Sequence, residues 1–532
     1  MRIALDPGSR DAPPRVRRLD EHGVPLGDVE VLPDLFAVAR LEKEHAPRWV
    51  IARPRTYRRL LDAGVEVARA HDVELTEGLL VAADGHFGQP HGLAAAVARL
   101  EGRTPAADPL RDDDGPPALF ESGPVGDELA DVVAVHAAQQ ARLTDPRMRL
   151  LVAAESAGGL VAEEMRATGL PWRADVHDAL LTEALGPRPV LGGRPPKLAV
   201  LAAEVDAAFG RRVNVDSPAE VLRAFGRVGV ELETTRSWEL KGVDHPAVAP
   251  LLAYKELARL HTAHGWAWLR TWVRPDGHGR GRFHPEYVVG GVVSGRWATR
   301  GGGALQIPKA VRAAVRADPG WKLVVADASQ LEPRVLAALS GDHALAPDED
   351  DLYAALAARE FGDDRAKAKL ALLSAMYGAG SGSAAQLMGR LRKRFPAAMA
   401  FVDDAARAGE EGRLVRSHLG RTCPPARPGH EEPAAARARG RFTRNFVVQA
   451  TAAEWALVLL ADLRSDLRGA GSPARLVFFQ HDEVVLHVPA EAAAATADAV
   501  QAAATTAGRR LFGATPVRFP MQARVVDGYD EH

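Results

Sequence analysis

Two stretches of sequence decide the fold. The first is KLVVAD at residues 322–327, an apolar run that ends in an acid and is followed by helical sequence at residues 332–339. Asp327 therefore lies where a strand gives way to a helix. The second is LVFFQHDEVVLHV at residues 476–488, in which two β-rich runs flank the polar segment QHDE at 480–483. This pattern predicts a β-hairpin with acids at its tip.

The acids of these two stretches suggest phosphoryl-transfer chemistry. Charged groups between apolar strands are costly unless they are solvated, paired or bound to a cation. Asp327 and Asp482 at the ends of neighbouring strands could hold two Mg²⁺ ions about 3.5–4 Å apart, an arrangement suited to in-line displacement at phosphorus. The alternative is that each acid only caps its own turn. Their spacing along the chain does not show whether they meet in space.

A basic helix is predicted between the two acids. In residues 364–378 the side chains Arg365, Lys369, Leu373 and Tyr377 recur every four positions and form one stripe on a helix. Two cations followed by an apolar and an aromatic group would suit a nucleoside triphosphate, with the cations on the phosphates and the other two near the base and sugar. The alternative is a solvated helix end whose apolar half belongs to the core.

Length and composition place the chain among globular enzymes. Its 532 residues suggest three or four folding units, and 47% hydrophobic with 26% charged residues is typical of soluble proteins. We expect no membrane span and no secretory signal, because long apolar runs are missing from the sequence. Cys423 is the only cysteine, which excludes disulfides within the chain. The net charge of −2 does not by itself indicate a nucleic-acid partner, so charge has to be judged locally. We expect a cytoplasmic, nucleoid-associated location.

Taken together, these segments resemble the family A DNA polymerases, the DNA polymerase I family. DASQLEPR at 327–334 is similar to motif A, residues 365–378 to motif B, and QHDE at 480–483 to motif C. Three further segments match in the same order: SGRWAT at 294–299, LQIP at 305–308, and residues 441–454 with Asn445, Gln449 and Thr451. Six ordered matches are far more specific than any one of them.

The resemblance implies a mixed α/β and α+β multidomain fold with a right-hand polymerase. A small α/β exonuclease-like domain of the ribonuclease H-like type, at about residues 1–145, would precede a polymerase domain at 146–532. Within that domain the thumb would span about 150–284, the palm about 285–340 and 430–532, and the fingers about 341–429.

The resemblance also implies a role for each site residue. Asp327 and Asp482 would bind two Mg²⁺ ions, with Mn²⁺ as a substitute and Glu483 as a further catalytic acid. Lys369 would also protonate the leaving pyrophosphate, and Glu332 would be the steric gate against a ribose 2′-hydroxyl. The nucleotide-binding set would be Arg365, Lys369, Leu373, Tyr377, Gln330 and Glu332. The set that contacts DNA would be Arg296, Gln306, Arg441, Asn445, Gln449 and His481.

Several positions depart from the family pattern. Leu373 stands where the family usually has Phe or Tyr, and Ala328 replaces the usual Tyr of motif A. Tyr353 takes the place of a phosphate-contacting His, and LQIP lacks the Asn usual before Ile. The acids and the Arg/Lys pair remain. We therefore expect activity with altered nucleotide selectivity or speed.

The N-terminal unit is predicted to be a degenerate exonuclease-like domain. Strands are expected at 49–52 and 65–68, and a loop at 105–126. Its two Asp-x-Glu triplets, at 28–30 and 72–74, are poor matches to an exonuclease strand, and Asp72 fits a helix start better. Asp131 could be a remnant of the last exonuclease acid, although the Tyr expected four residues earlier is Asp127.

The predicted function is template-directed DNA polymerisation in replication or repair. The expected partners are primer–template DNA and deoxynucleoside triphosphates, with no membrane and a monomeric chain. Arginines at 437–444 are expected to contact phosphates, whereas the basic cluster at 390–394 is more typical of a solvated helix face. Alternatives left open are a catalytically weak DNA-binding factor on a polymerase scaffold, residual 3′–5′ exonuclease activity beside the polymerase, and a nuclease that acts through the N-terminal unit.

Overall fold

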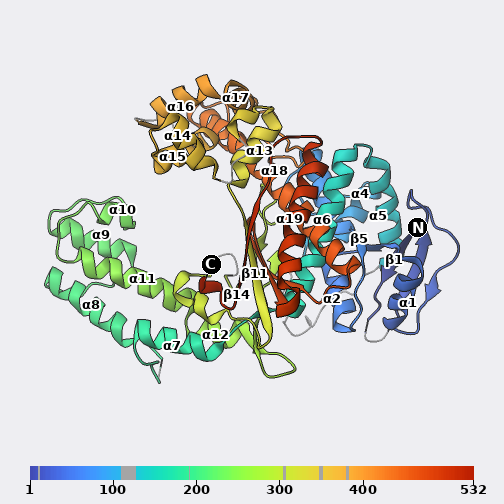
Figure 1. Cartoon of the computed structure of the whole chain (residues 1–532), viewed down its shortest axis with the longest axis horizontal. Coiled ribbons are helices and arrows are strands. Elements are labelled where there is room, and N and C mark those ends of the chain that lie inside the picture. The colour runs from blue at the N-terminus through green and yellow to red at the C-terminus, as the bar shows by residue number, and fades with distance from the viewer. Residues whose placement is uncertain are drawn as a thin grey trace. The chain divides into compact units, whose positions relative to one another are not determined.

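The structure is a computed structural model that describes residues 1–9, 12–109, 127–190, 192–303, 307–346, 351–378 and 383–531. The chain forms two compact units. Unit 1 comprises Met1–Thr168, Tyr287–Thr299 and Gly320–Val525, and unit 2 comprises Gly169–Glu286, Arg300–Pro319 and Val526–His532. Both units are therefore assembled from segments far apart in the sequence (Figure 1).

The N-terminal part of unit 1 contains a mixed sheet in the order β3-β2-β1-β4-β5. β1 pairs with β2 antiparallel and with β4 parallel, and β4 pairs with β5 parallel. The strands are β1 (Arg2–Asp6), β2 (Arg15–Leu19), β3 (Glu30–Val31), β4 (Arg48–Ile51) and β5 (Arg69–Asp72). The helices around them are α1 (Phe36–His45), α2 (Pro54–Asp62), α3 (Val73–Ala83), α4 (Leu93–Leu100) and α5 (Glu128–Arg142).

One of the two strands expected in this part is correct and the other is wrong. β4 confirms the strand expected at 49–52. Residues 65–68 form no strand, because Gly64 adopts a left-handed φ of 74° and the Val65 amide bonds back to Leu60 O at 2.8 Å. The buried valines there close a helix end, and the strand follows as β5. Of the expected loop at 105–126, residues 105–109 are irregular and 110–126 lie outside the described residues.

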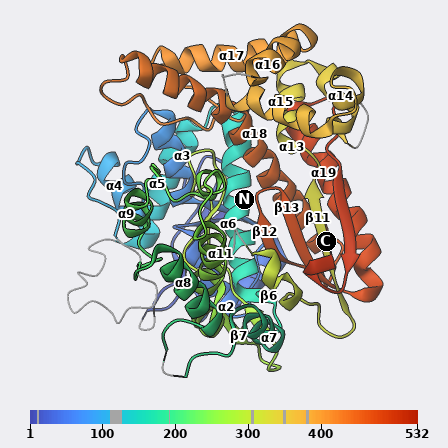
Figure 2. The same cartoon turned by 90° about the vertical axis from the view of Figure 1, so that its left-hand side faces the viewer.

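The second sheet of unit 1 has the order β12-β13-β11-β14. Its strands are β11 (Trp321–Ala328), β12 (Arg475–Gln480), β13 (Glu483–Pro489) and β14 (Met521–Val526). β12 and β13 form the predicted hairpin, and β13 pairs antiparallel with β11 so that Glu483 stands opposite Asp327. Figure 2 shows β11, β12 and β13 side by side; α19 (Ala493–Phe512) packs against β11 and β13, and α18 (Pro433–Gly469) packs against α19.

The remaining helices of unit 1 are α6 (Pro146–Thr168), α13 (Leu331–Ser340), α14 (Leu352–Glu360), α15 (Arg365–Tyr377), α16 (Ser383–Arg394) and α17 (Pro396–Glu410). Of these, α15 carries motif B and α6 contacts a strand of each sheet, β5 and β12. The short strands β9 (Tyr287–Val288) and β10 (Ala298–Thr299) pair with each other. The helices expected at 332–339 and 365–378 are confirmed as α13 and α15.

The 37-residue helix α18 is long and apolar enough to cross a membrane by length and composition. However, 83% of its apolar window is buried inside the protein. Its apolar residues, among them Trp455, belong to the main hydrophobic core of unit 1. We therefore interpret α18 as a core helix.

Unit 2 is mainly helical, with a small sheet in the order β6-β8-β7. Its elements are β6 (Leu170–Pro171), α7 (Ala174–Leu185), α8 (Pro196–Phe209), α9 (Pro218–Arg227), α10 (Ser237–Leu240), α11 (Val248–His264), α12 (Trp266–Trp272), β7 (Val273–Pro275) and β8 (Gly281–Phe283). Ser217 caps α9, since its hydroxyl accepts the Glu220 amide. The thumb was placed at about 150–284, whereas α6 belongs to unit 1; the division into thumb, palm and fingers stays a prediction.

Candidate active site

The two predicted acids come together at the tip of the hairpin. Gln480 pairs with Glu483, so His481 and Asp482 form a two-residue turn, and His481 takes a left-handed φ of 58°. The Ala328 amide donates to the Asp482 carbonyl at 3.1 Å, which joins this turn to the end of β11. Asp327 and Glu483 are directly opposite each other on adjacent strands, and such residues point to the same face of a sheet.

The electrostatics of this tip favour a cation. Burial, and next the negative charge of Asp327, raise the pKa of Asp482 to about 7. The positive charge of Arg296 acts in the opposite direction, and Glu332 adds to the increase. Two carboxylates that oppose each other's ionisation would both be relieved by a divalent ion between them. Groups of three or more metal-ligating side chains are not found in the described part of the chain.

A small cavity of about 150 Å³ opens beside Asp482. Arg296 and Glu332 pair across it at 2.5 Å, and the Tyr377 hydroxyl donates to the other Glu332 oxygen at 3.1 Å. Gln449 extends this network by donating to the Tyr377 hydroxyl at 3.3 Å. Four predicted site residues thus form one hydrogen-bonded row. The cavity is lined by Arg296, Gln330, Leu331, Glu332, Pro333, Tyr353, Leu373, Ala452, Ala453, His481 and Asp482.

The motif B helix presents its cations to solvent near this cavity. The Arg365 guanidinium lies 5.5 Å and the Lys369 ammonium 5.9 Å from the centre of the Tyr353 ring, a side chain that lines the cavity. Arg365 also pairs with Asp351 at 2.8 Å. Both partners are about half exposed, so this pair contributes little and a phosphate could displace it. Leu373 lies in the cavity wall, and its predicted contact with base or sugar stays a prediction.

A tyrosine that sequence reasoning missed holds the hairpin in place. The Tyr287 hydroxyl donates to the Phe479 carbonyl at 2.9 Å and accepts the Phe479 amide at 3.0 Å. β12 is an edge strand of its sheet, so among the described residues the Phe479 amide and carbonyl that bond Tyr287 face no neighbouring strand on that side. Tyr287 takes the place of such a strand. Trp297 packs against the Phe479 ring with centroids 4.9 Å apart.

The family model that matches this chain is DNA polymerase family A, over residues 196–527. That range covers more than half of the chain and includes every predicted site residue. The chain belongs to DNA polymerase family A. The resemblance expected from the six ordered motifs is thereby confirmed.

Curated relatives of this family A polymerase chain are bacterial. DNA polymerase I of Chloroflexus aurantiacus is 28% identical over 348 residues, which is 59% of this chain and 35% of the relative. The thermostable DNA polymerase I of Thermus aquaticus is 27% identical over 378 residues, 63% of this chain and 43% of the relative. The chain thus matches about a third to two fifths of the length of these relatives.

A solved structure confirms the fold of the whole chain. The POL domain of Pol1 from M. smegmatis, in complex with DNA primer-template and dNTP, superposes with a TM-score of 0.71 at 19% identity. The match covers 99% of this chain and 95% of that one. The predicted mixed α/β multidomain class is correct. The identity of the N-terminal unit as a former exonuclease remains a prediction.

The predicted DNA-contacting residues of this family A polymerase differ in their exposure and in their hydrogen-bond partners. Arg441 is exposed beside Gly378, at the end of α15, and Asn445 is half-buried with a carbonyl oxygen that lacks a partner among the described residues. His481 lines the cavity. Gln306 lies outside the described residues.

Two arginines of the cluster at 437–444 are engaged within the protein. Arg444 is buried and pairs with Asp403, and Arg439 donates to the Pro424 carbonyl at 3.0 Å. Burial against α17 argues against a phosphate contact for Arg444, whereas for Arg439, which is partly exposed, that contact stays a prediction. In the basic cluster at 390–394, Arg394 pairs with Glu360, which is compatible with the solvated helix face predicted there.

Gln330 has a structural role in this conformation. Its side-chain oxygen accepts the Leu352 amide at 3.0 Å, and its own backbone takes a left-handed φ of 50°. It thus fixes the start of α14 to the start of α13. Arg334 of motif A is almost completely buried and donates to Ser329 O and Arg518 O, which anchors α13 beneath the cavity. A buried arginine in a short helix is hard to foresee from sequence.

In the N-terminal part of unit 1, several acids pair with arginines. Arg15 pairs with Asp6 at 2.8 Å and with Asp127 at 2.7 Å. Arg53 pairs with Glu74 at 3.2 Å. Of the Asp-x-Glu triplets, 28–30 is exposed, and Asp72 caps α3 by accepting the Leu75 amide, as expected. A guanidinium thus lies beside Asp6, Asp127 and Glu74, where a metal ion would otherwise have to bind.

Proposed function

We propose that this chain is a template-directed DNA polymerase that adds deoxynucleotides to the 3′ end of a DNA primer. The observation that carries the proposal is Asp482, which lines a cavity together with motif A and motif B residues and lies close enough to Asp327 for that charge to raise its pKa. Membership of DNA polymerase family A and the names of the relatives support it. The reaction would be a nucleotidyl transfer that releases pyrophosphate.

Asp327 and Asp482 would hold two Mg²⁺ ions, or Mn²⁺ in their place. The raised pKa of Asp482 fits this assignment, because burial and the nearby charge of Asp327 oppose its ionisation and a bound cation would favour it. Bound divalent ions would neutralise charge on the transferred phosphate and align the attacking and leaving oxygens. Glu483, opposite Asp327 in the ladder, would add negative charge at the same edge.

The cations of α15 would bind the triphosphate. Arg365 offers a planar fork that suits phosphate oxygens, and Lys369 lies one turn further along the same face. Both are exposed, so they can reach a charged ligand without first being desolvated. Lys369 would donate a proton to the leaving pyrophosphate. Because catalysis of this reaction is mainly positioning and charge neutralisation, these side chains complete the required set.

The row formed by Arg296, Glu332, Tyr377 and Gln449 would select the nucleotide sugar. A carboxylate held on both oxygens cannot easily move aside, so Glu332 would exclude a 2′-hydroxyl from the cavity. Leu373 would give an apolar contact that lacks a hydroxyl. We therefore expect discrimination on the 3′ side of the sugar to differ from that of family members with Phe or Tyr at this position.

The test is primer extension by the intact protein with Mg²⁺ and the four deoxynucleoside triphosphates. Asp482→Ala should lower the extension rate by at least about 1,000-fold, as expected for loss of a metal ligand. Asp498→Ala, which removes an exposed acid from α19, is the matched control and should extend like the wild type. A wild type that binds primer–template tightly but fails to extend it would favour the weak DNA-binding factor instead.

The proposed partners are primer–template DNA and deoxynucleoside triphosphates, and the proposed setting is DNA replication or repair in the cytoplasm by a monomeric chain. The paired acids of the N-terminal unit support a structural role for that unit rather than proofreading. Metal-dependent removal of 3′ ends from single-stranded DNA that persists in Asp327→Ala would contradict this part of the proposal.

A further inference from the structure

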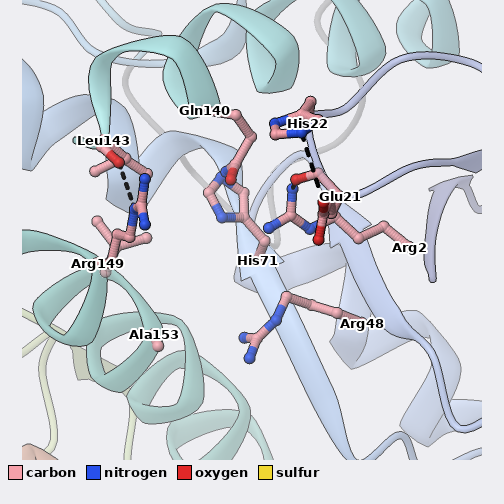
Figure 3. A pocket seen from close by; sticks show the side chains of 10 residues that line it. Arg2, Glu21, His22, Arg48, His71, Gln140, Leu143, Arg149 and Ala153 are labelled. Atoms are coloured by element: carbon pink, nitrogen blue, oxygen red, sulfur yellow. Dashed lines mark hydrogen bonds and ion pairs between the residues drawn. The ribbon is translucent and has the colours of Figure 1, made fainter. Parts of the chain in front are cut away.

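A second cavity, of about 450 Å³, lies in unit 1 far along the sequence from the motifs of the polymerase site. It is bordered by β1, β4, β5 and the helices α5 and α6 (Figure 3). Figure 3 shows Arg149 on one side and Arg2 with Glu21 and His22 on the other, with His71 between them. The lining residues are Arg2, Glu21, His22, Arg48, His71, Gln140, Leu143, Arg149, Val152 and Ala153.

Three guanidinium groups converge on this cavity from separate segments. Each donates to one backbone carbonyl: Arg2 to Glu21 O, Arg48 to Ala70 O at 3.0 Å, and Arg149 to Leu143 O at 2.5 Å. A guanidinium has five N–H groups, so most of this donor capacity remains for a ligand or for water. Across the described residues, none of the three forms an ion pair with a carboxylate.

Burial and neighbouring like charges make the positive charge of these arginines unfavourable, which indicates that a ligand compensates it. Burial, and then the charges of Arg69 and Arg2, lower the pKa of Arg48. The pKa of Arg2 is also lowered, mainly by burial and partly by Arg149, although Asp20 and Glu21 act against this. Like charges crowded in a partly enclosed space repel one another unless an anion joins them. Glu21 is the acid at the rim, and its side chain is 86% exposed and free to move away.

We propose that this cavity is a binding site for a phosphate-bearing anion of nucleotide size. Arginine forks recognise phosphate oxygens in pairs, and three of them suit a ligand with more than one negative charge. A water molecule occupies about 30 Å³, so the volume of the cavity corresponds to roughly fifteen waters. This is more space than a single phosphate group fills. Leu143, Val152 and Ala153 supply an apolar wall on which a nucleoside could rest. The site does not depend on the proposed polymerase activity.

The experiment is calorimetric titration of the intact protein in low salt with EDTA, which suppresses metal-dependent triphosphate binding at the polymerase site. The probes are inorganic pyrophosphate, dAMP, dATP and deoxyadenosine. Wild type should bind the first three, more weakly as salt is added, and should not bind the uncharged nucleoside. Equal binding of pyrophosphate and dATP would assign recognition to the phosphates, and tighter dATP would add the nucleoside.

Variants on the surface of α6 make the test specific. Arg149→Gln removes one exposed guanidinium and should weaken pyrophosphate binding about tenfold, in line with loss of a charge-assisted hydrogen bond. Arg147→Gln, two residues earlier on the same helix, and Lys369→Ala at the polymerase site should leave this binding unchanged. Primer extension by Arg149→Gln should equal that of wild type. Binding that Lys369→Ala abolishes, that Arg149→Gln leaves intact, or that deoxyadenosine shares would overturn the proposal.

Discussion

Asp482→Asn should make the metal-free protein more stable while it abolishes catalysis. The pKa of Asp482 rises from an ordinary 3.8 to about 7 in the folded protein, so folding opposes its ionisation. Between pH 4 and pH 7 the unfolded chain has lost this proton and the folded protein has not, so stability falls as pH rises and then levels off above about pH 7. Asparagine keeps the shape of the side chain and removes the charge.

The size of this effect follows from the shift. About three pKa units correspond to about 4 kcal/mol, which solvent access at the cavity mouth reduces to roughly 2 kcal/mol at pH 8. In a chain of this size that is about 2 °C in Tm. Scanning calorimetry in EDTA should therefore show a gain in Tm at pH 8 and no gain near pH 4. Added Mg²⁺ should raise the Tm of wild type more than that of the variant. An equal or lower Tm for the variant at pH 8 would refute the argument.

Three further changes test other parts of the molecule. Arg464→Met should lower the free energy of unfolding by about 3 kcal/mol in a denaturant titration, because it leaves the Glu164 carboxylate without its buried partner. The control Arg468→Met breaks a more exposed pair with Glu66 and should lower that free energy by less than about 1 kcal/mol. Glu332→Ala should raise ribonucleotide incorporation relative to deoxynucleotide by at least about tenfold in single-nucleotide extension, and an unchanged ratio would remove its role as a gate. Arg365→Ala should raise the KM for deoxynucleotides about tenfold or more, while Asp351→Asn should change it less than about threefold; similar effects of the two would mean that their pair, not the phosphate contact, matters.

The strongest predictions from sequence concern elements whose pattern is local. The strand ending at Asp327, the hairpin around 480–483 and the helix from Arg365 are all present, because alternation, turn residues and capping are encoded within a few positions. The strand expected at 65–68 is wrong, and here too the cause lies within a few positions. Two buried valines matched the strand pattern, but the left-handed Gly64 had already turned the chain at the end of α2.

What the sequence did not provide is partner choice between distant segments. Nothing in motif A shows that Glu332 is held by both Arg296 and Tyr377, or that Gln330 fixes the start of α14. The basic cluster at 437–444 is a second case in which the sequence does not show which residues find partners within the protein. Its arginines look alike in sequence, and only packing against α17 makes Arg444 a structural residue while Arg441 stays exposed.

The two groups of acids in unit 1 differ in how their charge is neutralised, and this difference separates a candidate catalytic site from a structural one. Asp6, Asp127 and Glu74 each have an arginine within 3.2 Å, so their charge is already balanced and a metal ion would gain little there. At the hairpin tip, Arg296 is occupied by Glu332 and the repulsion between Asp327 and Asp482 remains. Chemistry that needs a divalent cation is therefore expected at the hairpin tip, where burial and the charge of Asp327 oppose ionisation of Asp482.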